Sequence, residues 1–219
     1  MCRFLLAKSS NSFLPKQILT EFAETAKKSK AFDGGWQGDG WGFSWLDKRN
    51  KWKLYRSLKP IWKDQSSFDS FPKTLICVIH ARSATFPQQK GNIEFNQPYL
   101  NNSYSFVFNG YLKGVSLSIP GKIGAEKIWF LLQKTLKEKK PVDALEKVKN
   151  ILKKNTKRIQ ALNIGFSDGK NIYALSYYSK HPEYYRLRYF KTRELSIISS
   201  EPIGDYLFSK TSSGSILSF

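Results

Sequence analysis

The residue best suited to act as a nucleophile is Cys2, which directly follows Met1. If Met1 is removed, Cys2 carries a thiol and a free α-amine on the same residue. The reference pKa of a thiol is about 8.5 and that of an α-amine about 7.7–8.0. Covalent catalysis requires such a base within reach of a nucleophile. The alternative is an inert cysteine at a frayed chain end. The apolar run over residues 3–7 predicts a strand that would hold Cys2 in a sheet, which favours the catalytic interpretation.

Two further segments place hydrogen-bond donors where strands are predicted to end. Arg82 closes an apolar strand predicted over residues 74–82, and its guanidinium either clamps a carboxylate with two parallel hydrogen bonds or reaches solvent. Asn109-Gly110 follows an alternating strand predicted over residues 103–108. The Asn109 amide and the Gly110 N–H could donate to one oxyanion, but Asn-Gly is also the commonest signal for a type I′ hairpin turn. The sequence leaves both pairs of alternatives open.

The remaining cysteine and histidines are predicted to be structural. Cys77, in the middle of the predicted strand, is interpreted as a core residue, and His80 in the same strand as a satisfied strand residue. His181 precedes Pro182 in a polar segment and is interpreted as a surface residue. The two cysteines and two histidines provide no metal-ligand spacing. We therefore predict no metal site and no cofactor.

The predicted helices and strands that must position these residues occur in groups along the chain and do not alternate regularly. Residues 15–30 have helical spacing, and a glycine-rich segment and a predicted hairpin follow over residues 34–57. Two amphipathic helices are predicted later, and the C-terminal part reads as a run of strands. This grouping predicts an α+β fold with mainly antiparallel sheets covered by helices. No linker interrupts it, so we expect one domain over residues 1–219. The later helices are predicted over residues 128–136 and 142–152, and the strands over 160–166, 171–178, 185–190, 194–199 and 214–219.

The composition supports a packed core and sets limits on the class of protein. Hydrophobic residues make up 41% of the 219 residues and aromatic residues 15%, which excludes a disordered chain. Two cysteines exclude a disulfide-dense scaffold. The apolar runs are far shorter than the roughly 20 residues of a membrane span, and the start lacks a secretory apolar region. We therefore expect a soluble cytoplasmic protein with no membrane partner.

Five short segments occur in an order that is informative as a set. Together they resemble the class II glutamine amidotransferases, which use an N-terminal nucleophile, and in particular the small stand-alone members of that family. The resemblance extends from residue 2 to about residue 210. The segments are Met1-Cys2-Arg3-Phe4-Leu5-Leu6, Asp39-Gly40-Trp41-Gly42-Phe43, Ile79-His80-Ala81-Arg82-Ser83-Ala84-Thr85, Phe106-Val107-Phe108-Asn109-Gly110 and Ser199-Ser200-Glu201-Pro202.

This resemblance implies a fold and a set of catalytic roles. The implied fold is a four-layer α-β-β-α sandwich of the N-terminal nucleophile hydrolase type. Cys2, after removal of Met1, is expected to attack the side-chain amide of glutamine while its α-amine relays the proton. Asn109 and Gly110 are expected to stabilise the tetrahedral oxyanion.

The substrate-binding residues agree with the family only in part. Arg82 is expected to hold the α-carboxylate of glutamine, and Thr85 lies in the same binding loop. Gly124 stands where the family has an aspartate that binds the substrate ammonium. Either Glu126 or a backbone carbonyl accepts that ammonium instead, or the natural substrate carries none. We favour a substrate without a free ammonium, namely a γ-glutamyl amide whose amine is acylated, or a related amide.

The predicted function is therefore an amidotransferase or amidohydrolase that acts on a small glutamine-like amide. Ammonia would pass to water or to a synthase that is a separate protein. One alternative is a catalytically diverged binding module on the same fold. Another is a basic nucleic-acid-binding protein, because the formal net charge is +19. Lysines without interleaved aromatic residues cover the polar faces of the predicted helices after residue 122, which favours a solvated surface and no specific nucleic-acid partner.

Overall fold

The computed structural model describes residues 1–29 and 35–219, so Lys30 and Gly34, at the predicted helix end and in the glycine-rich segment, lie outside the described residues. The described strands form two antiparallel sheets. The seven-stranded sheet has the order β11-β9-β10-β1-β4-β2-β3, and the five-stranded sheet has the order β12-β8-β7-β6-β5. The strands of the first sheet are β1 (Arg3–Phe13), β2 (Trp41–Leu46), β3 (Trp52–Ser57), β4 (Thr74–Ala81), β9 (Arg188–Lys191), β10 (Leu195–Ser199) and β11 (Ser209–Lys210). Those of the second are β5 (Tyr99–Leu100), β6 (Ser105–Val115), β7 (Thr156–Ser167), β8 (Ile172–Ser176) and β12 (Ser215–Ser218).

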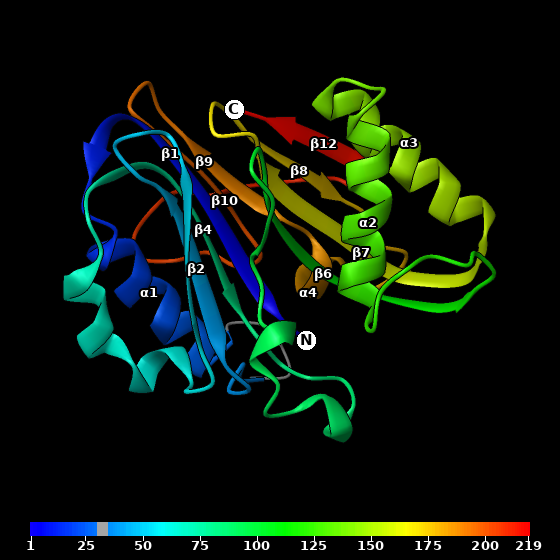
Figure 1. The fold of residues 1–219 in the computed structure, drawn as a ribbon, viewed down its shortest axis with the longest axis horizontal. Coiled ribbons are helices and arrows are strands. Elements are labelled where there is room, and N and C mark those ends of the chain that lie inside the picture. The colour runs from blue at the N-terminus through cyan, green and yellow to red at the C-terminus, as the bar shows by residue number, and fades with distance from the viewer. Residues whose placement is uncertain (30–34) are drawn as a thin grey trace.

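Helices cover the outer face of each sheet. Figure 1 shows α1 (Lys16–Lys27) beside the seven-stranded sheet, and α2 (Gly124–Leu136) and α3 (Pro141–Lys154) beside the five-stranded sheet. A short helix, α4 (Pro182–Tyr185), precedes β9. Short 3₁₀ helices occupy the connections, at η1 (Ile61–Lys63), η2 (Gln65–Ser70), η3 (Pro87–Gln89) and η4 (Ile93–Phe95).

Alternating apolar side chains produce the layers. Successive residues of a strand point to opposite faces. Leu5 and Ala7 of β1 accordingly join the core beneath α1, while Phe4 and Leu6 join a core between the two sheets. A further core lies between the five-stranded sheet and the helices α2 and α3, and it includes Phe106, Leu132, Leu145, Val148 and Phe166. The predicted four-layer α-β-β-α sandwich is therefore confirmed.

The central position of β1 in its sheet determines where the N-terminal residues lie in the fold. β1 lies between β10 and β4, with Arg3 opposite Ala81 and Leu5 opposite Ser199. The residue before β1 therefore lies beside the residues that follow β4. The fold brings Cys2 to the end of the strand that leads into Arg82, although the two are far apart in sequence.

The structure corrects the turn interpretation of Asn109-Gly110. Both residues lie inside β6, where Asn109 is opposite Asn163 and Gly110 is opposite Leu162 of β7. A type I′ turn needs positive φ at both central residues, and neither residue is among the described positions with positive φ. Pairing with the long strand β7 thus overrides the local turn preference.

Two other strand predictions also need correction. The segment predicted as a strand over residues 185–190 begins in α4, and only Arg188–Lys191 forms β9. The apolar character of residues 74–82 favours a strand that is buried on both faces, but Leu75 is 43% exposed, whereas the rest of β4 is buried.

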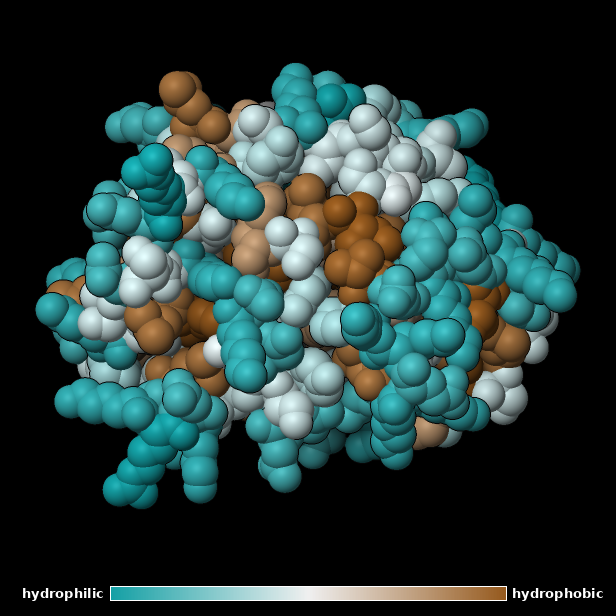
Figure 2. All heavy atoms as spheres, turned by 90° about the horizontal axis from the view of Figure 1, so that it is seen from above, coloured by the Kyte–Doolittle hydropathy of each residue, from teal (hydrophilic) through white to brown (hydrophobic). Residues whose placement is uncertain are grey.

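The surface carries most of the charge. Figure 2, which views the molecule from above relative to Figure 1, shows hydrophilic side chains over most of that face and apolar ones gathered near its middle. Within the described ranges, no helix is long and apolar enough to cross a membrane.

Candidate active site

One cavity of about 640 Å³ brings the predicted site residues together. Its walls come from the two residues before β1, the end of β4 and the segment after it, β6 and the loop that follows, the start of α2, and Leu152 of α3. The cavity is therefore built from separate parts of the chain that only the tertiary fold brings together. All six predicted residues line it: Cys2, Arg82, Thr85, Asn109, Gly110 and Gly124.

The Cys2 thiol faces the backbone that follows β4. Its Sγ accepts a hydrogen bond from the Ser83 N–H at 3.4 Å and lies 3.5 Å from the Ser83 carbonyl oxygen. The Cys2 carbonyl accepts a hydrogen bond from Arg3 Nη1 at 3.1 Å. Met1 also lines the cavity and packs against Ala161, Tyr184 and Tyr185. Cys2 is thus held on both sides within the cavity.

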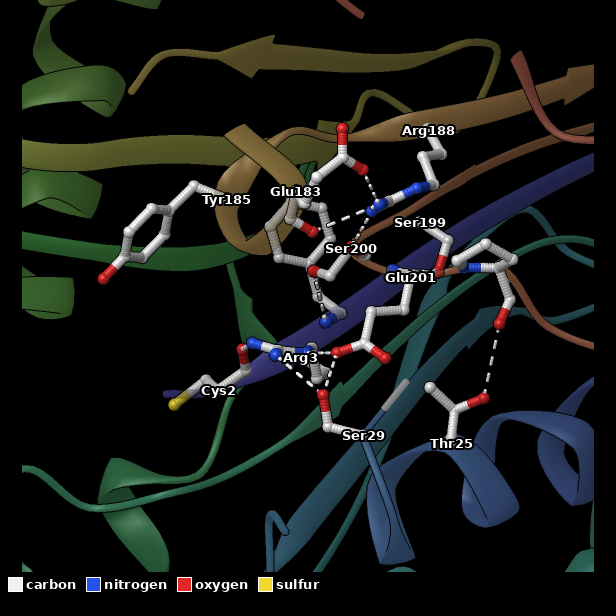
Figure 3. A network of polar contacts seen from close by, with 12 residues as sticks. Cys2, Arg3, Thr25, Ser29, Glu183, Tyr185, Arg188, Ser199, Ser200 and Glu201 are labelled. Carbon is white, nitrogen blue, oxygen red and sulfur yellow. Dashed lines mark hydrogen bonds and ion pairs between the residues drawn. The ribbon is translucent and has the colours of Figure 1, made fainter. Parts of the chain in front are cut away.

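A buried ion pair anchors the residue that follows Cys2 (Figure 3). Arg3 and Glu201 are only 1% and 3% exposed, and Arg3 Nε donates to Glu201 Oε1. Arg3 Nη2 also donates to Ser29 Oγ at 3.1 Å, and the guanidinium lies 4.7 Å from the centre of the Tyr184 ring. A buried pair with its remaining hydrogen bonds satisfied fixes geometry. The Arg3–Glu201 pair therefore positions the backbone of Cys2.

Sequence reasoning missed this role of Arg3 and Glu201. The signal was present as an arginine within the first apolar strand and a glutamate in the Ser-Glu-Pro segment. Pattern alone does not identify the partner of either charge, because 198 positions separate them.

Arg82 is a buried cation that has no carboxylate partner among the described residues. It is 3% exposed, and Nη2 donates to the Gln89 carbonyl at 2.6 Å. Nη1 makes longer contacts of 3.4 Å with the Asn92 carbonyl and with Asn96 Oδ1. Neutral oxygens compensate a buried charge only in part. Arg82 therefore makes its end of the cavity favourable for an anion.

Asp39 holds the backbone that follows Arg82. The Ala84 N–H donates to Asp39 Oδ2 at 2.8 Å, and Lys90 Nζ lies 3.3 Å from Asp39 Oδ1. The Asp39 and Arg82 backbones are also joined by a hydrogen bond of 3.0 Å. Thr85 comes next in this segment and is exposed at the cavity rim.

The Asn109 side chain is buried but has no hydrogen-bond partner in the described part of the chain. It is 2% exposed, and its Oδ1 is unpaired. The preceding backbone is fixed, because the Gln97 side chain accepts from the Phe108 N–H and donates to the Phe108 carbonyl. An amide held in place without a partner is available to a ligand in the cavity.

Gly110 is required by close packing. A Cβ built there would clash with the Ala161 carbonyl oxygen and lie 2.6 Å from Cζ of the Phe108 ring. Any side chain at position 110 would therefore displace β7 or the ring of Phe108.

The structure contradicts the interpretation of His80 as a satisfied residue. His80 is fully buried and lines the cavity, and neither ring nitrogen makes a hydrogen bond of normal geometry to a described residue, although the Phe108 backbone lies close enough to oppose the fall in its pKa slightly. Burial, together with the nearby charges of Arg82 and Arg56, lowers the pKa of His80 to about 3. The imidazole is therefore neutral at physiological pH. Cys77 is core, as predicted, and burial raises the pKa of its thiol to about 12.

Gly124 is the first residue of α2 and faces open space. A Cβ built at Gly124 would meet nothing within 4 Å. Glu126, one candidate to replace the missing aspartate, accepts the Lys122 N–H at 2.6 Å at the start of the helix and does not line the cavity. In the part of the cavity lining that the structure describes, no residue is an aspartate or a glutamate. No group of three or more His, Cys, Asp or Glu side chains in the described ranges could hold a metal ion.

Comparison with known proteins gives matches at the level of structure. No protein-family model matches the chain, and no curated protein matches it. A glutamine aminotransferase class-II domain protein from Silicibacter pomeroyi superimposes with a TM-score of 0.66 at 18% identity, over 99% of this chain and 94% of the other. A predicted glutamine amidotransferase from Pseudomonas aeruginosa gives a TM-score of 0.55 at 17% identity, over 100% of this chain and 97% of the other.

A larger enzyme contains the same fold as one part. The glutamine phosphoribosylpyrophosphate amidotransferase from Bacillus subtilis gives a TM-score of 0.66 at 16% identity, over 100% of this chain but only 47% of that chain. Identities this low carry information about the fold and not about the reaction. The resemblance inferred from five sequence segments is thus confirmed for the architecture, and the chain has the N-terminal nucleophile hydrolase fold of the class II glutamine amidotransferases.

Proposed function

We propose that this chain is an amidohydrolase of the class II glutamine amidotransferase type, formed by one domain and using Cys2 as its nucleophile. The observation that carries the proposal is the shared cavity, in which the Cys2 thiol, the unpaired Asn109 amide and the buried Arg82 cation all face the same space. A nucleophile, an oxyanion donor and an anion-binding group are the parts that hydrolysis of an amino-acid side-chain amide needs.

The reaction begins with a mature N-terminus. Once Met1 is removed, the α-amine of Cys2 takes the thiol proton as Sγ attacks the carbonyl carbon of the amide. The carbonyl oxygen becomes an oxyanion and accepts hydrogen bonds from Asn109 Nδ2 and the Gly110 N–H. The α-amine then passes the proton to the leaving nitrogen, the C–N bond breaks, and ammonia departs. A thioester remains on Cys2.

Water completes the cycle. The α-amine accepts a proton from the water that attacks the thioester, and the C–S bond breaks to give a carboxylate and the free thiol. Arg82 binds the α-carboxylate of the substrate throughout, while Thr85 contributes to the rim of the same site. The ammonia passes to water or to a synthase that is a separate protein.

The site determines which variants separate catalysis from folding. Ammonia release should be measured from glutamine and from N-acetylglutamine, with wild type, Cys2→Ala and Cys77→Ala. Cys2→Ala should abolish turnover, because removing the nucleophile removes nearly all of the rate enhancement. Cys77→Ala is the matched control, because this buried thiol lies in the core beneath α1. Ammonia release by Cys2→Ala at the wild-type rate would refute the proposal.

A binding module on the same fold remains the second candidate, and Gly124 is the observation that favours it. The residue offers no side chain for a substrate ammonium. If the chain only binds, the Cys2→Ala variant should bind glutamine-like ligands as tightly as wild type, and neither protein should release ammonia from any of them.

A further inference from the structure

We propose that the substrate carries an apolar acyl group on its α-nitrogen, and that this group lies along the outer part of the cavity, between the end of β6 and the start of α2. This inference rests on the proposed function, since it takes the amide to be cleaved at Cys2 with the α-carboxylate held by Arg82. It specifies the chemical class of the substrate, namely an N-acylated glutamine or γ-glutamyl amide with net negative charge.

Charge is the first argument. The described lining residues include Arg82, Lys113, Lys122 and Lys127 but no carboxylate. Of these lysines, Lys122 lies 3.4 Å from the exposed carboxylate of Glu94, outside the cavity lining. Among these described residues, a free ammonium taken from water into the cavity would meet like charges and no acceptor anion. An acylated nitrogen is neutral, so only the α-carboxylate remains charged, and the cations favour it.

The start of α2 supplies the second argument. Gly124 leaves open space where a side chain would otherwise project. The first N–H groups of a helix have no partner within the helix, and the positive end of its dipole attracts oxygen atoms rather than ammonium groups. α2 has 13 residues, and its N-cap residue Ile123 gives no side-chain hydrogen bond. An acyl carbonyl oxygen beside Gly124 would accept from these N–H groups.

Apolar side chains beyond this point supply the third argument. Tyr111 and Val115, on the outer half of β6, are 36% and 39% exposed although they line the cavity. Leu117, Ile119 and Ile123 continue the apolar wall and are half-buried. Six residues of strand separate Asn109 from Val115, a length of roughly 20 Å at about 3.3 Å per residue. A cavity of about 640 Å³ lies in the range that suits drug-sized ligands. The wall therefore has room for a chain of several carbon atoms.

Binding to Cys2→Ala protein tests the inference without turnover. Titration calorimetry should compare free glutamine with N-acetyl-, N-butanoyl- and N-octanoylglutamine. We expect free glutamine to bind most weakly and affinity to rise about two- to fourfold per added methylene, as burial of apolar surface requires. The peptide acetyl-Leu-Leu-Gln forms a separate arm, because a peptidyl group is also an acyl group, and the comparison shows which source of the acyl group fits better.

Variants locate the acyl group. Leu117→Asp should abolish the rise in affinity with chain length, and Leu207→Asp is the matched control because Leu207 is 90% exposed and does not line the cavity. Gly124→Asp should improve binding of free glutamine and weaken that of N-acetylglutamine. Equal affinity along the series, or a chain-length effect that survives Leu117→Asp, would overturn the inference. Neither result depends on ammonia release, so the inference can fail while the proposed function holds, and the reverse is also true.

Discussion

The buried imidazole of His80 gives a quantitative test of the cavity electrostatics. An unperturbed histidine has a pKa of about 6.5, whereas burial and the neighbouring Arg82 and Arg56 lower the pKa of His80 to about 3. Between these two values the unfolded chain binds a proton that the folded chain does not. The stabilising effect of a neutral His80 is therefore complete above pH 6.5 and is lost as the pH falls toward 3.

The magnitude follows from this difference in proton binding. Between pH 7 and pH 5 the unfolded-state histidine goes from about one quarter protonated to almost fully protonated, while the folded-state histidine stays neutral, so the free energy of unfolding should fall by about 2 kcal/mol. The result depends little on the exact folded-state pKa, provided that it lies well below 5.

Urea denaturation of wild type and His80→Phe at both pH values isolates this contribution. Phenylalanine has a similar ring shape and no titrating nitrogen, so contributions from other groups cancel in the comparison. Wild type should lose about 2 kcal/mol more than His80→Phe between pH 7 and pH 5. His181→Asn controls for the loss of an exposed imidazole as such. An equal loss in wild type and His80→Phe would refute the burial and charge argument for His80, and with it the description of an electropositive cavity.

Three further predictions test other parts of the account. Asn109→Ala should lower kcat by about 10²–10³ while binding changes little; a loss of activity that only follows a loss of folded protein, measured on the same preparation, would make Asn109 structural. Glu201→Gln should reduce the free energy of unfolding by about 3–5 kcal/mol, because it leaves the Arg3 cation buried without its anionic partner. The double variant Arg3→Met, Glu201→Met should recover part of this loss in a urea titration. A free energy of unfolding equal to wild type in Glu201→Gln would contradict the role of the buried pair. Binding to duplex DNA should be weak, independent of sequence and absent near physiological salt, as checked by fluorescence anisotropy across a salt series, and tight binding at physiological salt would favour the nucleic-acid alternative.

Strong local patterns allowed much of the fold to be predicted. The hairpin predicted within residues 34–57 is observed as β2 and β3, and helical spacing predicts α2 and α3 to within a few residues. The shared cavity could be anticipated only from the resemblance, because its segments lie far apart in the sequence. These patterns are local, and the structure that they predict forms when the tertiary contacts favour the same structure.

The rest depends on contacts that no local pattern contains. Asn109-Gly110 has strong turn propensity, but the backbone pairs with β7, which lies more than 40 residues later in the chain. The pairing of Arg3 with Glu201 spans nearly the whole chain. His80 alternates like any strand residue, and only the tertiary fold shows that its face opens into the cavity. Sequence patterns therefore identify strands more readily than the surroundings of their side chains.

The most direct test of the central claim is intact mass spectrometry with a reactive substrate analogue. The analogue is N-acetylglutamine with a chloromethyl ketone in place of the side-chain amide, so that a thiolate displaces chloride and forms a stable thioether. The account predicts a mass that lacks one methionine and gains one adduct, located on Cys2 by peptide mapping and absent from Cys2→Ala. A protein that retains Met1 and stays unmodified, or an adduct located on Cys77, would contradict the assignment of Cys2 as the nucleophile.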